Sequence, residues 1–395
     1  MNKLTIRDAE PAGRRLFLRV DFNVPLDSKG AISDDTRIQA SLPTIRYGIE
    51  HGAKLILASH LGRPKGQPVG SMTLRPAAER LAELVRSPVA FANDCVGPEV
   101  EAQARGLAAG GVLLLENLRF HPEEEKNEEG FSRRLAALAD LYVNDAFGSA
   151  HRAHASTVGI TKYLAPALAG FLMEREINYL SKAVENPARP YTAIVGGAKV
   201  SDKMELLQNL MKFADNVLIG GAMAYTFLKA RGVEVGKSRV EDDKLELARN
   251  ILSFGERRSI RIRLPEDHVV TEKLEASAHG EISAGGIPAG RLGADIGPAT
   301  RAQYAAVIAD SKTIVWNGPL GVFEIPQFAE GTLAVARAVA ASSAVSIVGG
   351  GDSAAAVHLA GVGEKITHVS TGGGATLEFL SGRKLPGVEA LTDRE

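Results

Sequence analysis

Two groups of chemically distinct side chains follow the short apolar runs of this 395-residue sequence. Arginines, histidines and short acidic or amide side chains make up the group in the N-terminal half, namely Asp21, Asn23, His60, Arg63, Glu116, Asn117, Arg119, Asn144, Asp145, His151 and Arg152. Arginine presents a planar fork of donors that matches the oxygens of carboxylates and phosphates. Several arginines that converge on one site therefore predict a small, highly anionic ligand.

Glycine dominates the corresponding positions in the C-terminal half. The group consists of Gly196, Gly197, Lys199, Gly220, Gly221, Asn317, Gly318, Gly349, Gly350, Gly351 and Asp352. Glycine-rich turns let backbone amides approach a phosphate closely. Lys199 supplies a cation for phosphate oxygens, and Asp352 supplies a carboxylate for the magnesium ion that a nucleotide carries. This half is predicted to bind a nucleotide, and the two halves together predict phosphoryl transfer.

The elements that must position these groups alternate between short apolar runs and longer segments of helical period, which is typical of a mostly parallel sheet covered by helices. The predicted strands are 16–20, 55–59, 112–116, 141–143, 193–195, 217–219, 313–316 and 346–348. Ligands of an open α/β sheet bind beyond the carboxyl ends of its strands, because loops and helix N-termini converge there. Both groups of side chains are expected at such ends.

A helical segment after Pro166 separates the two halves. Its apolar residues at 168, 172, 173, 177, 180 and 184 form one stripe, and Asn186 and Pro187 end it. The length of the chain fits two domains, so this segment is predicted to join two α/β halves. An ordinary crossover helix within one large sheet remains an alternative.

Composition excludes several classes of protein. The chain has 46 basic and 47 acidic residues, which argues against nucleic acid as a partner. No apolar run approaches the roughly 18 residues that a membrane span needs, and residues 1–10 do not resemble an export signal, so we expect a cytoplasmic protein with no membrane partner. Cys95 is the only cysteine, so an intrachain disulfide or a cage of several thiolates cannot form. His151 and His154 have helical spacing but no third ligand nearby in the sequence, which argues against a metal pair.

Two nucleotide-binding patterns can be set aside. The segment 232–238 (GVEVGKS) resembles a Walker A loop, but its glycines are one residue too close and the position for the first glycine holds Arg231. The first strand is not followed by a Gly-x-Gly-x-x-Gly turn with an acidic residue about twenty positions later, which disfavours a dinucleotide oxidoreductase.

Nine segments in order along the chain closely resemble the phosphoglycerate kinase family. They are 19–25 (RVDFNVP), 35–38 (DTRI), 59–64 (SHLGRP), 115–120 (LENLRF), 143–154 (VNDAFGSAHRAH), 196–203 (GGAKVSDK), 316–324 (WNGPLGVFE), 349–353 (GGGDS) and 370–374 (STGGG). The resemblance runs from about residue 5 to residue 389. It implies an α/β fold with two doubly wound, Rossmann-like parallel-sheet domains, a long connecting helix and an interdomain active-site cleft.

The resemblance also implies domain limits and roles. An N-terminal domain of 1–166 with the tail 378–395 would bind 3-phosphoglycerate or 1,3-bisphosphoglycerate, 167–186 would form the connecting helix, and 187–377 would bind the magnesium nucleotide. The acid would contact Asp21, Asn23, Arg37, His60, Arg63, Arg119 and Arg152. The nucleotide would contact Lys199, Lys203, Gly220, Gly221, Gly293, Asn317, Glu324, Gly350, Gly351, Asp352 and Ser353. Asp352 would hold Mg²⁺, and the catalytic groups would be Arg37, Lys199, Gly351 and Gly374.

The implied activity is reversible transfer of the acyl phosphate of 1,3-bisphosphoglycerate to MgADP, with hinge closure and a monomeric state. A protein that keeps the fold but has lost its chemistry should lack Arg37, Lys199 or Asp352, and the sequence has all three. A kinase for another small acid remains an enzymatic alternative. Two details depart from expectation: Ala294 is smaller than the family's usual residue, and Ser201 lacks the acidic partner at position 204 that a full capping box needs.

Overall fold

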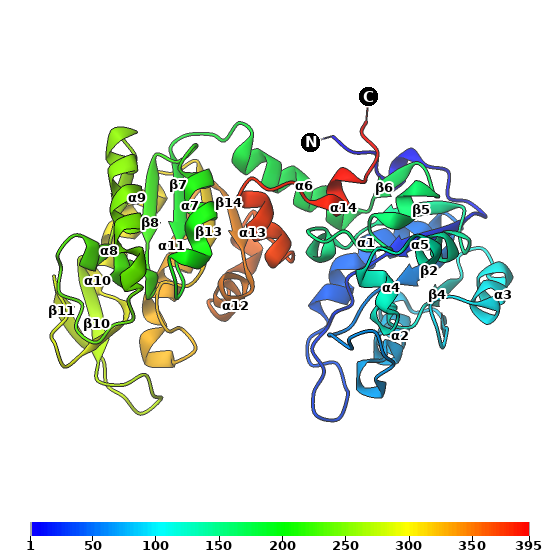
Figure 1. Ribbon diagram of the computed structural model, residues 1–395, viewed down its shortest axis with the longest axis horizontal. Coiled ribbons are helices and arrows are strands. Elements are labelled where there is room, and N and C mark those ends of the chain that lie inside the picture. The colour runs from blue at the N-terminus through cyan, green and yellow to red at the C-terminus, as the bar shows by residue number, and fades with distance from the viewer. Residues whose placement is uncertain (1, 395) are drawn as a thin grey trace. The chain divides into compact units, whose positions relative to one another are not determined.

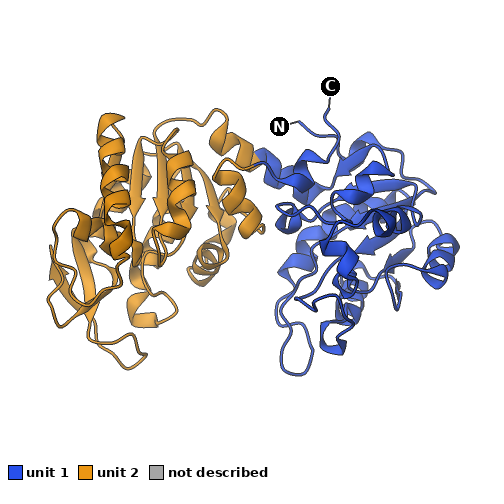
Figure 2. Ribbon diagram, viewed as in Figure 1, with its two compact units in different colours: residues 1–178, 384–395 blue, residues 179–383 orange. Residues whose placement is uncertain are grey.

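The computed structural model describes residues 2–394, which divide into two compact units (Figure 2). Unit 1 comprises Met1–Asn178 and Lys384–Glu395, and unit 2 comprises Tyr179–Arg383. The division falls inside helix α6 (Phe171–Val184), so this helix contributes residues to both units.

Unit 1 is built on a six-stranded parallel sheet in the order β3-β4-β2-β1-β5-β6. Its strands are β1 (Arg15–Arg19), β2 (Lys54–Ala58), β3 (Val89–Phe91), β4 (Val112–Leu114), β5 (Leu141–Asn144) and β6 (Ala167–Ala169). Leu16 pairs with Leu55 in register, and both are fully buried in the core of this unit. Strands buried on both faces read as continuous apolar runs, which explains why the sequence pattern predicts them.

The helices of unit 1 follow its strands and carry their own start signals. They are α1 (Thr36–Glu50), α2 (Arg75–Val85), α3 (Pro98–Gly106), α4 (Pro122–Glu125), α5 (Glu129–Ala136) and α14 (Pro386–Glu389). The Glu128 carboxylate accepts hydrogen bonds from the backbone amides of Gly130 and Phe131 at the start of α5. Such bonds satisfy amides that have no partner inside the helix.

The two ends of the chain lie side by side in unit 1 (Figure 1). The Leu4 amide donates to the Thr392 carbonyl at 2.9 Å, and the Thr392 amide donates to the Ala167 carbonyl at 2.9 Å. Lys3 pairs with Asp393 at 2.7 Å. The C-terminal segment is therefore part of the N-terminal unit.

Unit 2 repeats the architecture with the strand order β15-β14-β13-β7-β8-β9, again all parallel. Its strands are β7 (Tyr191–Val195), β8 (Asn216–Ile219), β9 (Arg261–Arg263), β13 (Thr313–Asn317), β14 (Val345–Gly349) and β15 (His368–Val369). Trp316 of β13 is fully buried in the core of this unit.

A second, three-stranded antiparallel sheet belongs to unit 2, in the order β11-β10-β12. Its strands are β10 (Asp267–Thr271), β11 (Glu281–Ala284) and β12 (Leu292–Ile296), and β10 and β11 are labelled in Figure 1. The Asp267 carboxylate of β10 accepts the Ala299 and Thr300 amides at 2.9 and 2.8 Å, which fixes the start of the next helix. The sequence pattern does not predict this sheet.

The remaining helices complete unit 2. They are α7 (Met204–Leu210), α8 (Met223–Ala230), α9 (Leu245–Arg257), α10 (Pro298–Ala309), α11 (Glu330–Ala341), α12 (Gly351–Leu359) and α13 (Gly374–Leu380). Helix α13 packs on α7, and the Asn209 side-chain amide donates to the Leu380 carbonyl at 2.7 Å. Because α13 belongs to unit 2, this unit ends at Arg383, later in the chain than residue 377, where the nucleotide-binding domain was expected to end. Among the described helices, none is long and apolar enough to cross a lipid bilayer.

All eight predicted strands are present, with ends that differ by one or two residues. The expected helix 167–186 is too long, because 167–169 form edge strand β6 beside β5. Leu168, assigned to the helical stripe by the sequence pattern, lies in that strand and is buried in the core of unit 1. The helix begins only at Phe171, where the Asp145 carboxylate accepts the Leu172 and Met173 amides at 2.8 and 3.1 Å.

Candidate functional site

Arg37, at the start of α1, is held by the loop that follows β1. Its guanidinium pairs with the Asp21 carboxylate at 2.5 Å; the Asp21 side chain is 8% exposed and that of Arg37 is 36% exposed. Gly148 packs directly against this pair, and a side chain there would not fit, because a Cβ atom would lie 2.5 Å from the Asp21 carboxylate oxygen. The arginine head group is thus oriented from behind while it stays accessible to a ligand.

Asn23, Arg119 and the loop after β2 form a second connected set. The Asn23 side-chain oxygen accepts the Gly62 amide at 2.9 Å, and the Arg119 guanidinium donates to the Gly62 carbonyl at 2.9 Å. Arg119 is 5% exposed, and burial lowers the pKa of its guanidinium. Glu125 lies 3.4 Å from it. Asn23 and Arg119, both predicted to bind the acid, therefore contact the same turn at Gly62.

Asn117 is the residue that holds the loops after β2 and β4 together. Its side-chain oxygen accepts the Leu61 and Arg119 amides at 3.2 and 3.1 Å, and its side-chain nitrogen donates to the Leu61 and Met72 carbonyls at 2.7 and 2.9 Å. The sequence showed Asn117 only as a residue that follows a predicted strand, without a role. Its place at the end of that strand, two positions before Arg119, was the available signal.

Behind these residues lies a buried cationic region around Arg19. Arg19 is 1% exposed, donates to the Ser156 hydroxyl at 2.9 Å, and lies 3.1 Å from the imidazole of His60. Burial, followed by the positive charge of Arg19, holds the pKa of His60 well below its usual value. The same two causes lower the pKa of His154 to about 3. Both histidines are therefore neutral near pH 7.

Glu124 is the counterion in this region. It is fully buried and accepts the Ser156 amide and hydroxyl at 3.0 and 2.6 Å. Burial raises the pKa of Glu124, although Arg19 opposes that effect. Glu124 belongs to the acidic stretch 123–129, in which solvated side chains would be the ordinary expectation, yet it is buried at the start of α4. Its burial depends on Ser156, which is remote in the sequence.

Arg63 and Arg152 complete the basic set. Arg63 is exposed in the loop after β2, and Arg152 is half-buried and donates to the His151 imidazole at 3.1 Å. The charge of Arg152 contributes to lowering the pKa of both Arg119 and His154, which places these groups in one electrostatic neighbourhood. Unit 1 thus offers several cations at the carboxyl ends of its strands, as an anionic ligand requires.

The glycine-rich loops of unit 2 touch one another directly. A Cβ atom on Gly196 would lie 2.0 Å from the Pro319 carbonyl oxygen, and one on Gly221, at φ +68°, would lie 2.7 Å from the Gly197 nitrogen. A Cβ atom on Gly220 would likewise lie too close, at 2.4 Å from a side-chain carbon of Leu320. Only glycine allows the loops after β7, β8 and β13 to approach so closely.

Lys203 and Asn317 join the first of these loops to the sheet. The Lys203 ammonium donates to the Asn317 side-chain oxygen, and the Asn317 side-chain nitrogen donates to the Gly349 carbonyl at 2.7 Å. Burial lowers the pKa of Lys203, while the carboxylate of Asp352 acts in the opposite direction. Lys203 and Asp352 are therefore close enough to interact electrostatically.

The loop after β14 leads into α12 and carries an exposed carboxylate. Gly350 has φ +96°, and the Ser353 hydroxyl accepts the Gly318 amide at 2.7 Å. Asp352 is exposed in the first turn of α12, next to Gly351. Mg²⁺ prefers oxygen ligands and is commonly bound through one or two carboxylates together with substrate phosphates. One exposed carboxylate beside glycine amides fits that requirement.

Glu241, which the sequence did not single out, holds the segment that directly follows Lys199. The Glu241 carboxylate accepts the amides of Val200 and Ser201 at 2.6 and 3.1 Å and the Ser201 hydroxyl at 2.6 Å. Ser201 was expected as a possible cap behind Lys199, but its hydroxyl donates to Glu241 instead. Burial tends to raise the pKa of Glu241, and these hydrogen bonds outweigh it, so the pKa is lowered.

Gly293 and Glu324 lie in different surroundings from the glycine-rich loops after β7, β8 and β14. Gly293 is in β12 of the antiparallel sheet, where a Cβ atom would lie 2.0 Å from the Tyr225 hydroxyl. Glu324 is exposed after β13. Ala294 is 2% exposed and packs in a small cluster with Val269 and Phe328.

The turn before α13 carries Gly374, the last of the catalytic groups implied by the resemblance. Gly373 has φ +51°, and Gly374 begins the helix and is exposed. Thr376 of α13 lies against Gly349. This contact connects the turn to the loop after β14.

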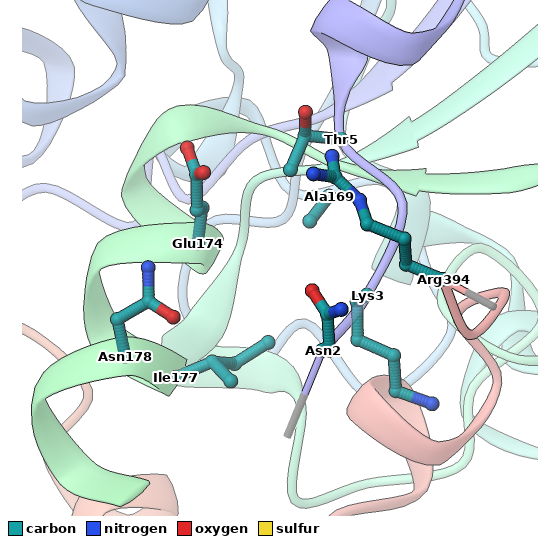
Figure 3. A pocket seen from close by; sticks show the side chains of 8 residues that line it. All are labelled: Asn2, Lys3, Thr5, Ala169, Glu174, Ile177, Asn178 and Arg394. Atoms are coloured by element: carbon teal, nitrogen blue, oxygen red, sulfur yellow. The ribbon is translucent and has the colours of Figure 1, made fainter. Parts of the chain in front are cut away.

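A small cavity of about 80 Å³ lies elsewhere in unit 1, between the chain termini and α6 (Figure 3). Its lining residues are Asn2, Lys3, Thr5, Ala169, Glu174, Ile177, Asn178 and Arg394. The three charged groups in this lining are already paired, Lys3 with Asp393, Glu174 with Arg7 and Arg394 with Asp8. The predicted acid-binding residues lie outside its lining.

Comparison with known proteins gives one consistent result. Residues 6–383 match the family model described as phosphoglycerate kinase. The chain is 57% identical to the phosphoglycerate kinase of Koribacter versatilis, with 100% of each chain covered, and 59% identical to that of Solibacter usitatus, with 99% of this chain and 100% of the other covered.

Solved structures agree with the sequence comparisons. The phosphoglycerate kinase of Coxiella burnetii has a TM-score of 0.91 at 40% identity, and that of Pyrococcus horikoshii OT3 has a TM-score of 0.85 at 36% identity. Each match covers 98% of both chains.

Proposed function

The chain belongs to the phosphoglycerate kinase family, and from that premise we propose that it reversibly transfers the acyl phosphate of 1,3-bisphosphoglycerate to MgADP, giving 3-phosphoglycerate and MgATP. The observation that carries the proposal is the family match over residues 6–383, on a chain that keeps Arg37, Lys199 and Asp352. A protein of this fold without activity would be expected to have lost at least one of these groups.

Unit 1 binds the phosphoglycerate in this proposal. Asp21, Asn23, Arg37, His60, Arg63, Arg119 and Arg152 form its binding set. The ion pair between Arg37 and Asp21, at 2.5 Å, and the bond of Arg119 to Gly62, at 2.9 Å, support it because they preorganise cations for a ligand with a carboxylate and a distant phosphate. His60 is neutral near pH 7, so it contributes hydrogen bonding and not charge.

Unit 2 binds the nucleotide. Lys199, Lys203, Asn317, Gly350, Gly351 and Ser353 surround its phosphates, Gly220, Gly221 and Gly293 line the base, and Glu324 contacts the ribose. Asp352 would hold Mg²⁺, which would supply positive charge to offset the negative charge that develops on the phosphates. The contact between Lys203 and Asn317 supports this assignment, since it connects two of the loops concerned.

The protein contributes position and charge, and no covalent intermediate is needed. The phosphoryl group in flight resembles metaphosphate, and its charge is spread over three equatorial oxygens. Arg37 and Lys199 donate to these oxygens, and the amides at Gly351 and Gly374 add donors at the N-termini of α12 and α13. Asp21 keeps the Arg37 fork oriented before the substrate arrives.

Since the acid and the nucleotide are assigned to different units, transfer requires a closed state in which both reach one phosphoryl group. Closure would also exclude water from an acyl phosphate that otherwise hydrolyses. Helix α6 contributes residues to both units, which makes it the proposed hinge. The proposal includes a monomeric, cytoplasmic enzyme.

A coupled assay tests the function. Purified protein is given MgATP with either 3-phosphoglycerate or acetate, and ADP release is followed. Turnover with 3-phosphoglycerate and only background with acetate is expected. Equal turnover with both acids would identify a less specific acyl kinase, and turnover with neither would reject the proposal. Omitting Mg²⁺ should abolish the reaction.

A further inference from the structure

Asp94, Cys95 and His121 bring three kinds of metal-binding atom to one place in unit 1. Asp94 and Cys95 lie in the loop after β3, and His121 lies between the turn Leu118–Phe120 and α4. One ligand atom from each residue lies within 4.8 Å of the others. Strands β3 and β4 are neighbours, so the loops at their carboxyl ends meet.

The fold holds these residues in position through independent contacts. The Glu116 amide donates to the Asp94 carbonyl at 3.4 Å, which connects the loops after β4 and β3. The imidazole Nε2 of His121 lies 2.7 Å from Asp94 Oδ1, and its ring stacks on Phe131 with centroids 5.2 Å apart. The site therefore does not depend on a mobile side chain.

Exposure differs across the three residues in a way that suits a bound ion. Cys95 is fully buried, whereas the side chains of Asp94 and His121 are 52% and 25% exposed. An ion can enter from the side of Asp94 and His121 and meet the thiol at the base. A buried cysteine alone is usually a small apolar side chain, but here a carboxylate and an imidazole face it.

We propose that Asp94, Cys95 and His121 bind a divalent cation of the Zn²⁺ class, with water as the fourth ligand. Sulfur, imidazole and carboxylate ligands favour such ions over Mg²⁺. Tetrahedral Zn²⁺ bonds of about 2.0–2.3 Å place ligand atoms roughly 3.3–3.8 Å apart, so the three atoms need to shift by about 1 Å or less. As the metal–sulfur bond forms, the thiol proton passes to solvent. This site is separate from the proposed Mg²⁺ of the nucleotide.

Cobalt titration of the full-length, chelator-treated protein tests this inference. A Co²⁺–thiolate bond gives a near-ultraviolet charge-transfer absorption, and because the chain has one cysteine that signal can come only from Cys95. We expect the absorption to saturate at one ion per chain and to disappear when Zn²⁺ is added. Mg²⁺ in excess should leave it unchanged.

Three variants of the site and one control variant distinguish binding at this site from binding elsewhere on the protein. His121→Gln and Asp94→Asn keep the buried thiol and should weaken Co²⁺ binding at least tenfold. Even the loss of a side chain that only hydrogen-bonds to a metal ligand typically lowers metal affinity by that factor. His279→Gln, at an exposed histidine of unit 2, is the matched control and should bind like the wild type. Cys95→Ser should lose the absorption, with circular dichroism confirming its fold.

Two results would overturn the inference. One is the absence of thiolate absorption, whether or not calorimetry detects Co²⁺ binding elsewhere on the protein. The other is an affinity that is the same in His121→Gln and in His279→Gln. Neither result bears on the kinase assay, which needs Mg²⁺ and no thiophilic ion, so failure here is distinguishable from failure of the proposed function.

Discussion

Arg37 shows how a single side chain is prepared for its proposed chemistry. Its guanidinium is fixed by Asp21 at 2.5 Å, yet more than a third of the side chain is exposed. Gly148 allows this geometry because a Cβ atom at that position would strike the carboxylate. The resemblance to the family identified Arg37 and Asp21, but the role of Gly148 appears only when the loop after β5 is folded against the loop after β1.

Replacing Arg37 by alanine should lower turnover by about a hundredfold or more, as is typical when one preorganised donor to a transition state is removed. Steady-state kinetics with both substrates would measure this effect. Arg46→Ala is a matched control, because Arg46 lies on the same helix and is exposed. Unchanged turnover in Arg37→Ala would exclude the residue from catalysis, and an equal loss in Arg46→Ala would point to damage of α1.

His154 should make stability depend on pH. Its pKa of about 3 in the folded protein lies below the ordinary value of 6.5, because the site is buried and faces Arg19. The unfolded chain therefore binds more protons between these values, so stability is present above about pH 6.5 and is lost as the pH falls toward about 3.

Urea unfolding at about pH 4.5 and about pH 7.5 would test this dependence. Each unit of displaced pKa corresponds to about 1.4 kcal/mol, and about two units separate pH 4.5 from the ordinary pKa of 6.5, so the wild type should lose roughly 3 kcal/mol more than His154→Gln between these conditions. His51→Gln, an exposed histidine of the same unit, should behave like the wild type. Parallel losses in wild type and His154→Gln would contradict the assignment.

At the scale of elements, the loops depend on side chains that accept backbone amides. Asn117 fixes the loops after β2 and β4, Asp145 fixes the start of α6, and Glu241 fixes the segment after Lys199. Sequence periodicity predicts strands and helices, but it does not predict such bonds, because their partners are distant in the chain. The site residues could be named from the family resemblance, whereas the residues that support them required the structure.

Glu241→Gln should raise the KM for MgADP several-fold and leave the KM for the phosphoglycerate unchanged. The carboxylate accepts three hydrogen bonds near Lys199, and a glutamine side chain has only one oxygen to replace two. Asp243→Asn is a suitable control, because it changes an exposed acid nearby. If Glu241→Gln had the same KM for MgADP as the wild type, the hydrogen bonds to Glu241 would not position the loop that carries Lys199.

At the scale of the whole molecule, sequence patterns predicted the two parallel sheets because their strands are continuous apolar runs. The short strands β3, β6, β9 and β15 and the antiparallel sheet were missed. Strand β11 has the sequence EISA and is largely exposed, so it has neither alternation nor an apolar run. The helix after Pro166 was overextended because Leu168 fits its stripe by spacing while it belongs to β6.

The central claim is that each unit binds its own reactant, and calorimetric titration of two variants tests it most directly. Arg63→Ala changes an exposed residue of unit 1, and Asp352→Ala an exposed residue of unit 2. Arg63→Ala should weaken binding of 3-phosphoglycerate and leave MgADP unaffected, and Asp352→Ala should do the reverse. If either folded variant weakened both ligands equally, or if the two effects were exchanged, the assignment of one reactant to each unit would be contradicted.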